Sequence, residues 1–381
     1  MSKWPMVRLG DVCDINMGQS PSSESYNEDK DGIPFYQGNA DFGEIHPNIR
    51  YFCNRPIKIA NADDVLLSVR APIGAVNIAT EKCCIGRGLC ALTQKDGLSY
   101  YRYIYHVIMR KSASLQALGT GSTFKAINKE VLHNVEITLP PIKIQKDAAN
   151  ILDKTQEIIY GHKKQLKELD NLIKATFYDM FGDPIENEQG WKIKTLEDVC
   201  NKITDGTHNS PTNYGIGKYK YITAKNIKKD GFDLSNLTYI SEADHKEIYN
   251  RCNPEFGDIL YIKDGVTTGI AQINTLLEEF SLLSSVALLK QKREIVNEYY
   301  LREVLNNEIM CANIRMNMGG AAITRLTVKK IELIRIPIPP MSTQNKFAEI
   351  VTNIETQKSL VKQSLADSQN LFNSLMSRYF D

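Results

Sequence analysis

The stretch ITLPPIKIQKDAANIL, from Ile137 to Leu152, has a second copy, IPIPPMSTQNKFAEIV, from Ile336 to Val351. The two copies lie 199 positions apart, and a proline pair recurs in register with a glutamine that follows it. The shared residues include Pro140 and Pro339, Pro141 and Pro340, Gln145 and Gln344, Ala149 and Ala348, and Ile151 and Ile350. In each copy an apolar segment leads through the prolines into a sequence that favours a helix. The chain therefore repeats a strand-to-helix junction.

A second repeat opens each half of the chain. WPMVRLGDVC, from Trp4 to Cys13, matches WKIKTLEDVC, from Trp191 to Cys200, at an offset of 187. Five of the ten residues are identical, and the two repeats occur in the same order in both halves. This agreement favours a duplication over chance. The two offsets differ by 12 residues, so the ends of each half form the repeated frame and the middle varies.

Length and composition limit the class of protein. A chain of 381 residues predicts two or three domains. Hydrophobic residues make up 42% and charged residues 24%, which are ordinary values for globular domains and exclude disorder or a collagen-like repeat for the whole chain. The net charge is only +1, so any DNA-binding surface must come from the arrangement of charges.

Neither a membrane nor a metal site is expected. No apolar run reaches the roughly 18 residues of a membrane helix, and the first residues lack the apolar core of a signal peptide, so we expect a cytoplasmic chain. The eight cysteines form no Cys-x-x-Cys pair and have no histidines at zinc spacing. We expect reduced and mostly buried thiols.

Each half begins with a mixed α+β pattern. Residues 1–141 and 191–340 contain short β-prone runs separated by Gly, Asn, Asp and Pro. The runs are Val65–Val69, Ala75–Ala79, Ile259–Lys263 and Ser285–Lys290. Helical stretches interrupt them at Tyr100–Arg110 and Glu298–Met310. The pattern predicts two α+β globules.

A long helix follows each proline pair. Residues 142–180 contain no proline and one glycine, and residues 341–380 contain neither, so both segments favour helix. At about 1.5 Å per residue each helix would be about 58 Å long. Gly182 and Pro184 suit the end of the first helix.

An apolar heptad stripe predicts that the two helices pair in an antiparallel way. The expected seam residues are Ala148, Ile151, Ile158, Leu169 and Leu172 in the first helix and Phe347, Ile350, Ile354, Val361, Leu371 and Leu375 in the second. Polar residues interrupt the stripes at Thr155, His162, Gln165, Gln357, Ser364 and Ser368. This polar centre either fixes the register of the helices or provides a place where another protein docks.

Catalytic motifs are missing from the sequence. It contains no P-loop, no dinucleotide-binding glycine motif, no nucleophile elbow, no His-Glu-x-x-His, and no Asn/Asp-Pro-Pro-aromatic motif of an amino-methyltransferase. Glu28 and Lys30 have the bare Glu-x-Lys spacing of some nucleases, but their polar surroundings predict a solvated turn. Together with the duplication, these observations favour a binding protein.

The order of the motifs resembles the specificity subunit of type I restriction-modification systems over the full length of the chain. The resemblance rests on two copies of Trp-x4-Leu-x-Asp-Val, a variable α+β segment, a Gly-rich motif before the last strand, and Pro-Pro-x-x-x-Gln at the start of a long helix. The first helix ends in Phe-Gly-Asp-Pro (residues 181–184), followed by Asn187 and Trp191. Each motif is weak alone, but their doubling and spacing are specific.

The resemblance implies an α+β fold with two pseudo-repeated target-recognition domains joined by two long antiparallel helices that form a coiled-coil-like spacer. The implied segments are a first recognition domain (1–141), a central spacer helix (142–181), a second recognition domain (182–340) and a C-terminal spacer helix (341–381). Each recognition domain would read one half of a bipartite site in double-stranded DNA. The helices would set the spacing of the half-sites.

The resemblance also implies partners. Two methyltransferase subunits would dock on the helices and restriction subunits would join them, in the cytoplasm of a prokaryote and without a membrane. The chain itself would be non-catalytic and would hold no cofactor, because S-adenosylmethionine, ATP and Mg²⁺ belong to the partner subunits.

Candidate DNA-binding residues follow from side-chain chemistry. Arg, Lys, Asn and Gln can read base edges, whereas Ser and Thr commonly hold phosphates. The candidates are Gln19, Ser20, Asn39, Arg70, Ser122, Thr123 and Lys125 in the first half and Thr207, His208, Lys225, Asn226, Lys263, Thr324 and Arg325 in the second. Lys125 matches Thr324, and Arg70 matches Asp264, so we expect the two half-sites to differ.

Two alternatives stay open at this point. One is an enzyme in which recognition is fused to methylation or cleavage, which would require an active site of unfamiliar type. The other is a duplicated protein-binding scaffold that does not read DNA sequence.

Overall fold

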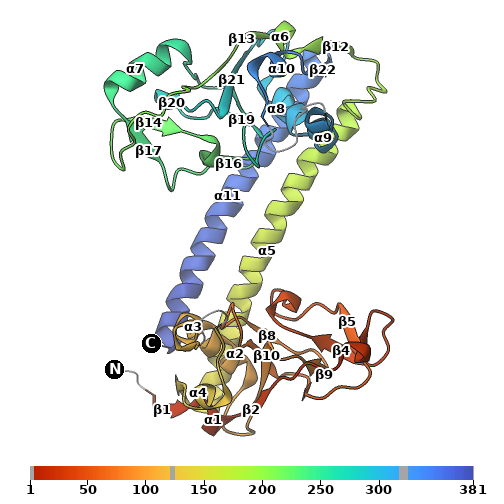
Figure 1. Cartoon of the computed structure of the whole chain (residues 1–381), viewed down its shortest axis with the longest axis vertical. Coiled ribbons are helices and arrows are strands. Elements are labelled where there is room, and N and C mark those ends of the chain that lie inside the picture. The colour runs from red at the N-terminus through yellow and green to blue at the C-terminus, as the bar shows by residue number, and fades with distance from the viewer. Residues whose placement is uncertain (1–3, 121–124, 317–324, 381) are drawn as a thin grey trace. The chain divides into compact units, whose positions relative to one another are not determined.

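The computed structural model describes residues 4–120, 125–316 and 325–380. The chain separates into two compact units, one comprising Met1–Lys163 with Lys362–Asp381 (unit 1) and the other Lys164–Val361 (unit 2). Each unit contains a globular α+β domain and parts of two long helices (Figure 1).

The centre of unit 1 is a four-stranded antiparallel sheet. Its order is β2 (Cys13–Met17), β10 (Leu89–Gln94), β7 (Val65–Ser68) and β8 (Val76–Ile78). A separate pair joins β1 (Met6–Arg8) to β11 (Glu136–Thr138), so the two ends of the globular segment meet. The outer sheet has the order β3 (Tyr26–Asn27), β5 (Tyr51–Cys53), β4 (Ile33–Tyr36), β9 (Cys83–Ile85) and β6 (Ile59–Ala60), with β4 and β9 parallel.

Unit 2 repeats this topology. Its four-stranded sheet has the order β13 (Cys200–Asp205), β21 (Val286–Gln291), β18 (Ile259–Ile262) and β19 (Ala271–Ile273). The end-joining pair is β12 (Lys192–Thr195) with β22 (Arg335–Ile338). The outer sheet is β17 (Thr238–Ile240), β14 (Tyr219–Ile222) and β20 (Phe280–Leu282), with β14 and β20 parallel, and a small pair joins β15 (Ile227–Lys228) to β16 (Gly231–Phe232). The shared strand order confirms the duplication.

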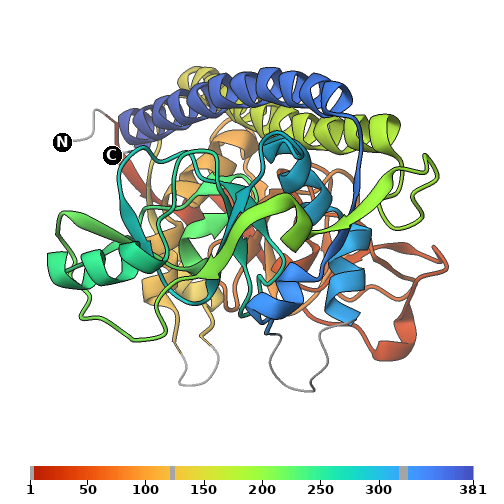
Figure 2. The same ribbon diagram turned by 90° about the horizontal axis from the view of Figure 1, so that it is seen from above.

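The short helices also recur. The pairs are α1 (Leu9–Val12) and α6 (Leu196–Val199), α2 (Tyr101–Arg110) and α8 (Glu298–Asn306), α3 (Ser112–Leu118) and α9 (Glu308–Met316), and α4 (Lys129–His133) and α10 (Val328–Glu332). The 3-10 turns are η1 (Ser23–Ser25), η2 (Asn39–Asp41) and η3 (Ala224–Asn226). Unit 2 adds α7 (Glu242–Arg251) in the variable middle of the repeat, which is where its longer sequence lies (Figure 2).

Two helices of 40 residues each follow the proline pairs. They are α5 (Ile142–Phe181) and α11 (Met341–Phe380). The first ends as predicted, because Gly182 has φ +72° and its amide donates to the carbonyl of Tyr178 at 2.9 Å.

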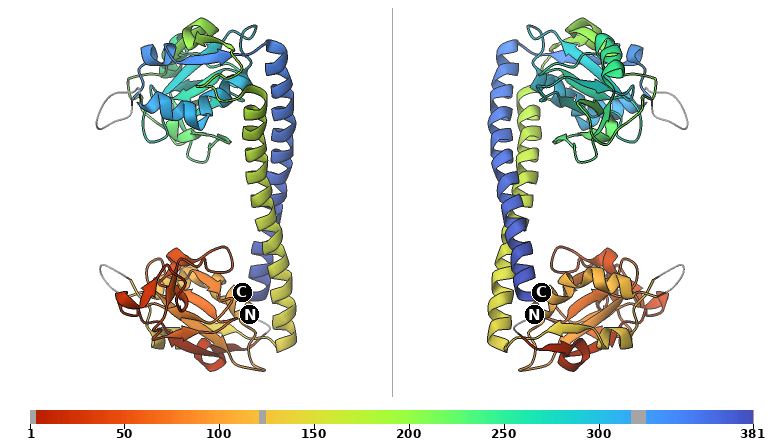
Figure 3. Two further views of the ribbon diagram at one scale, coloured as in Figure 1. Left: turned by 90° about the vertical axis from the view of Figure 1, so that its right-hand side faces the viewer. Right: turned by 90° about the vertical axis from the view of Figure 1, so that its left-hand side faces the viewer.

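The helices are antiparallel within each unit (Figure 3). In unit 2, Lys358 pairs with Asp170, and the Phe347 ring lies 5.8 Å from the ring of Phe177. In unit 1, Tyr103 connects β11, the strand before α5, to the end of α11. Its hydroxyl donates to the carbonyl of Thr138 at 2.7 Å, and its ring lies 5.3 Å from that of Phe380.

The predicted helix seam is half right. Ala148, Leu169, Phe347, Ile354 and Val361 are buried as expected. Leu375 is half-buried and packs against the core of unit 1. The other five predictions are wrong by one residue: the predicted residues Ile151, Ile158, Leu172, Ile350 and Leu371 are exposed, and the residues that follow them, Leu152, Ile159, Ile173, Val351 and Phe372, are buried.

The physical reason lies in the globular domains. Ala149 and Met376 in unit 1, and Phe177 in unit 2, are buried in the same clusters as the core of their domain. One flank of the helix pair is therefore covered by the domain, which turns the buried face toward that flank.

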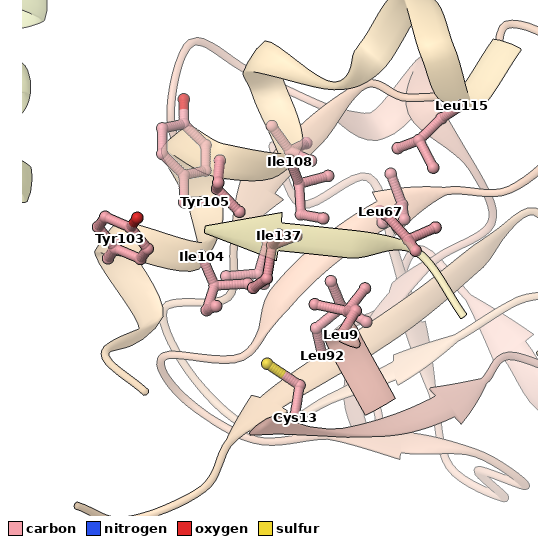
Figure 4. Packing of buried hydrophobic residues seen from close by; sticks show 14 of the residues in the cluster. Leu9, Cys13, Leu67, Leu92, Tyr103, Ile104, Tyr105, Ile108, Leu115 and Ile137 are labelled. Atoms are coloured by element: carbon pink, nitrogen blue, oxygen red, sulfur yellow. The ribbon is translucent and has the colours of Figure 1, made fainter. Parts of the chain in front are cut away.

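The core of unit 1 joins the four-stranded sheet, α2 and β11. Leu9, Leu92, Ile104 and Ile137 pack together there with less than 2% of each side chain exposed (Figure 4). All eight cysteines are free and seven are buried, as expected. Burial raises the pKa of Cys13 to about 12, so its thiol stays neutral as a core residue.

Candidate nucleic-acid interface

In unit 1 the predicted residues Gln19 and Ser20 leave the end of β2 against the turn between β9 and β10. The amide of Gly18 donates to the carbonyl of Leu89 at 2.9 Å, and the amide of Gln19 donates to the carbonyl of Ile85 at 3.0 Å. A Cβ atom at Gly18 would lie 2.2 Å from the carbonyl oxygen of Gly86. Only glycine allows this approach, which fixes where the side chains of residues 19 and 20 emerge.

Ser20 connects three loops. Its hydroxyl oxygen accepts a hydrogen bond from the Gln37 side-chain amide at 2.8 Å and from the Arg87 backbone amide at 3.2 Å. The side chain of Gln19 is exposed beside it. Asn39 begins the η2 turn that follows Gln37 and is half-buried. The loops after β2, β4 and β9 are therefore joined by their polar groups.

A second pair of predicted residues extends this group of loops. Arg70 pairs with Ala126 in an antiparallel bridge, and the amide of Ala71 donates to the carbonyl of Lys125 at 3.2 Å. The amide of Val69, next to Arg70, donates to the carbonyl of Gly88 at 2.9 Å. The side chains of Arg70 and Lys125 are both exposed.

The prediction missed Arg87. This residue is exposed at the tip of the β9–β10 turn, between Gly86 and Gly88. The signal was present in the sequence, because a charged residue between two glycines interrupts the buried run CCIGRGLCAL. Ion pairs among the described residues do not include Arg70, Arg87 or Lys125, so this group of loops presents three free cations.

Unit 2 builds the same loops on the same backbone bonds. The amide of Gly206 donates to the carbonyl of Val286 at 3.3 Å, and the amide of Thr207 donates to the carbonyl of Leu282 at 2.8 Å. The amide of Lys263 donates to the carbonyl of Ser285 at 2.9 Å. These bonds match those of Gly18, Gln19 and Val69 in unit 1. We call the two equivalent groups of loops the reading loops: residues 18–20, 37–39, 69–71, 86–88 and 125–126 in unit 1, and residues 206–208, 223–226, 263–265, 283–285 and 325 in unit 2.

The electrostatics differ between the two sets of reading loops. In unit 2, Asp205 precedes the first loop, and its carboxylate lies 3.0 Å from His208 Nε2, 2.8 Å from the guanidinium of Arg251 and 3.3 Å from Lys263 Nζ. The equivalent positions in unit 1 are Met17 and Val69 for Asp205 and Lys263. Ion pairs with Asp205 therefore connect the loops of unit 2, whereas at the equivalent positions of unit 1 Val69 is buried in the apolar core and Met17 packs against that core.

Two predicted residues of unit 2 lie beneath the surface. Lys263 is 2% exposed and its ammonium is held by Asp205 and by Asp264 at 3.6 Å. Asn226 is 6% exposed, and its side chain accepts from the Thr223 amide at 3.0 Å and caps η3. Neither side chain is placed to contact a base, because each is buried and already bonded to protein groups. Each side chain instead supports the loop that carries it.

The other predicted residues of unit 2 are accessible. His208 and Lys225 are exposed, and Thr207 is half-buried. Arg325 is exposed and its Nε lies 3.3 Å from the carboxylate of Asp264, which makes it a neutralised cation. Ser122, Thr123 and Thr324 lie outside the described residues.

Within the part of the chain that the structure describes, no cluster of His, Cys, Asp or Glu has the geometry of a metal site. Among these same residues, no helix is both long and apolar enough to cross a membrane. Glu28 lies in an exposed turn, where Asn27 Oδ1 accepts from the amide of Asp29 at 3.0 Å, as expected for a solvated loop.

Comparisons with known proteins agree with this architecture. The family model described as the type I restriction modification DNA specificity domain matches residues 1–171 and again residues 188–367. The chain belongs to this family. It is a specificity subunit of a type I restriction-modification system, which is a non-catalytic component, and the fused-enzyme alternative is set aside.

Individual relatives cover the chain to different extents. The putative type I restriction enzyme MjaX specificity subunit of Methanocaldococcus jannaschii is 39% identical over 170 residues, which are 44% of this chain and 40% of that protein. The MjaIX specificity subunit of the same organism is 25% identical over 381 aligned positions, covering 91% of this chain and 86% of that one.

A solved structure covers the whole fold. The crystal structure of the type I restriction-modification S subunit from M. genitalium aligns with 100% of this chain and 96% of its own, with a TM-score of 0.65 and 16% identity. This likeness supports the fold of two similar domains and long helices. Family membership indicates DNA and the other subunits of a type I system as the general kinds of partner for this specificity subunit.

Proposed function

We propose that this specificity subunit reads a bipartite sequence in double-stranded DNA, with the reading loops of each unit contacting one half-site. One observation carries the proposal. The two sets of reading loops share three equivalent backbone hydrogen bonds but carry different side chains, for example Gln19 against Thr207 and Arg70 against Asp264. Equivalent loops with different side chains would meet equivalent DNA grooves and select different bases.

The accessible candidates divide by chemistry. Gln19, Asn39 and Arg70 in unit 1 and His208, Lys225 and Arg325 in unit 2 would face base edges or phosphates. Ser20 and Thr207 would contact phosphates. Lys263 and Asn226 would position these groups from below.

The helices α5 and α11 would set the distance between the half-sites and carry two methyltransferase subunits. Support comes from apolar residues left exposed on the helices. In unit 1, Ile151 and Leu371 are 42% and 54% exposed, and in unit 2 their repeat equivalents Ile350 and Leu172 are 39% and 49% exposed.

Each of these four residues immediately precedes a buried seam residue, so all occupy the same heptad position. Each unit thus exposes two apolar side chains at equivalent positions, which suits two copies of one partner. S-adenosylmethionine, ATP and Mg²⁺ would be bound by the methyltransferase and restriction subunits, and none by this chain.

The test is a methylome. The chain is co-expressed with the methyltransferase subunit of its own type I system in a host free of DNA methylation, and the modified bases are mapped. The proposal expects one split motif with methyl-adenine in both halves and a fixed gap. A stable complex of the two proteins without any methylated motif would favour the scaffold alternative.

A further inference from the structure

We propose that Arg87 reads a guanine in the half-site contacted by unit 1. The inference rests on the proposed function and adds a residue and a base to it. It begins from the turn between β9 and β10, where Arg87 stands exposed between two glycines.

The turn is held rigidly by the neighbouring loop. The amide of Gly86 donates to the carbonyl of Tyr36 at 2.8 Å, and the amide of Gly88 donates to the carbonyl of Gln37 at 3.2 Å. A Cβ atom at Gly86 or at Gly88 would lie 2.6 Å from an atom of Gln37. Only glycine on both sides allows this packing, which leaves Arg87 as the side chain that the turn projects.

The tip of the turn is also tied to the first reading loop. The Arg87 amide donates to the hydroxyl of Ser20 at 3.2 Å, so its backbone is anchored beside Gln19. The planar guanidinium forms two parallel hydrogen bonds, so it loses less side-chain entropy per hydrogen bond than a single donor does, and guanine O6 and N7 present the matching acceptors in the major groove.

The surrounding charge suits DNA. Arg70 and Lys125 are exposed on the adjoining loops, and no carboxylate among the described residues forms an ion pair with Arg87. These neighbours are available for phosphates, which require no fixed geometry. Arg70 and Lys125 would therefore contact phosphates, and Arg87 would contact the base edge.

Unit 2 has a different solution at this position. Ser284 is the equivalent of Arg87, since it precedes Ser285, whose carbonyl accepts from the Lys263 amide as the Gly88 carbonyl accepts from the Val69 amide. Leu283 and Ser285 replace the two glycines. The arginine reader is therefore specific to unit 1, and its loss should alter one half-site only.

The experiment compares methylomes of the complete chain with its methyltransferase, for the wild type and for Arg87→Ala, Arg87→Lys and the control Arg8→Ala. Arg8 is exposed at the end of β1. It comes before β2 in the chain, whereas the first reading loop follows β2. Arg8→Ala changes the net charge by the same amount as Arg87→Ala. Thermal unfolding of each variant confirms that it folds.

The expected result is loss of selectivity at one guanine of one half-site, by roughly tenfold or more for Arg87→Ala. Lysine can also donate to guanine O6 and N7 but lacks the rigid planar fork of donors, so Arg87→Lys should restore this selectivity only in part. Uniformly weaker methylation that Arg87→Lys restores would overturn the proposal in favour of a phosphate contact, and an unchanged motif would overturn it entirely. Absence of any split motif in the wild type would instead refute the proposed function.

Discussion

Gln145 and Gln344, which occupy the same place in the two repeats, make the same three hydrogen bonds. Both side chains are fully buried at the start of a long helix. The side-chain oxygen of each accepts from a backbone amide, and the side-chain nitrogen donates to two carbonyls. The partners are Tyr100, Leu98 and Pro140 for Gln145, and Asn297, Ile295 and Pro339 for Gln344. Each glutamine ties the helix start to the loop that precedes α2 or α8.

Replacing either glutamine with alanine should destabilise its unit strongly. The change leaves three backbone groups without their partner, and the bond to the carbonyl of Pro140 or Pro339 is the fully buried one. A buried group without a partner costs about 1–3 kcal/mol and the half-buried ones cost less. We expect Gln145→Ala and Gln344→Ala to lower the free energy of unfolding by about 2–4 kcal/mol, measured by urea denaturation. Gln165→Ala, on the exposed surface of α5, is the control and should change it by less than about 0.5 kcal/mol. Equal effects of all three would refute the role of the two glutamines.

Asp153 makes the stability of unit 1 depend on acid pH. Burial on its own would raise the pKa of Asp153, but hydrogen bonds and positive charge from His106 and Arg102 outweigh it and hold the pKa below its ordinary value. The carboxylate lies 2.8 Å from His106 Nε2 and 2.9 Å from the Arg102 guanidinium.

A lowered pKa stabilises the folded state above the unfolded-state pKa, near 4, and this stability is lost as the pH falls through the folded-state value. Asp153→Asn should therefore cost about 1–3 kcal/mol at pH 7, and the gap to wild type should close below about pH 4. Unfolding curves measured between pH 7 and pH 2.5 check this. A gap that stays constant over that range would contradict it.

The ion pair of Asp205 and Lys263 in unit 2 stands where unit 1 has the apolar residues Met17 and Val69. Asp205→Met alone leaves Lys263 buried with only Asp264 as a partner, so we expect a loss of about 3–5 kcal/mol. The double change Asp205→Met with Lys263→Val copies Met17 and Val69 of unit 1 and should recover much of that stability.

Recognition should respond differently from stability in this pair. The double variant still lacks the carboxylate that holds His208 and Arg251, so methylation at the half-site of unit 2 should stay impaired. Urea denaturation and the methylome measure the two properties separately. A double variant less stable than Asp205→Met would contradict the view that apolar residues can replace the Asp205–Lys263 ion pair.

The exposed apolar residues of the helices predict the stoichiometry of the complex. Ile151→Asp with Leu371→Asp should remove one methyltransferase subunit, and Ile350→Asp with Leu172→Asp should remove the other. The mass of the purified complex, measured by light scattering, reports this loss. Gln369→Asp with Asn373→Asp, at exposed polar positions of α11 that do not share the heptad position of Leu371, is the matched control. Retention of two subunits by both apolar-patch variants would place the docking surface elsewhere.

Local patterns explain how much could be predicted from the sequence. The proline pair, the following glutamine and the lack of helix breakers are all local, so the junctions and both long helices were predictable. The seam was shifted because apolar residues stand side by side at Ile151 and Leu152, and again at Ile350 and Val351. Only the packing of the globular domain against one flank decides which residue of each pair is buried.

The reading loops were less predictable because their contacts are long-range. Ser20 meets Gln37 and Arg87, which are 17 and 67 positions further along the chain. Lys263 looked like a surface cation at the end of a strand, but its partner Asp205 comes from β13. No local pattern indicates which loops the sheet order brings together.

The central claim is that each unit reads its own half of the DNA site. Methylomes of Gln19→Ala and His208→Ala, obtained with the same methyltransferase, test it most directly because these exposed residues lie on equivalent loops of units 1 and 2. We expect each variant to relax one half of the split motif and leave the other half and the gap unchanged. Two variants that relax the same half, or both halves together, would contradict the claim.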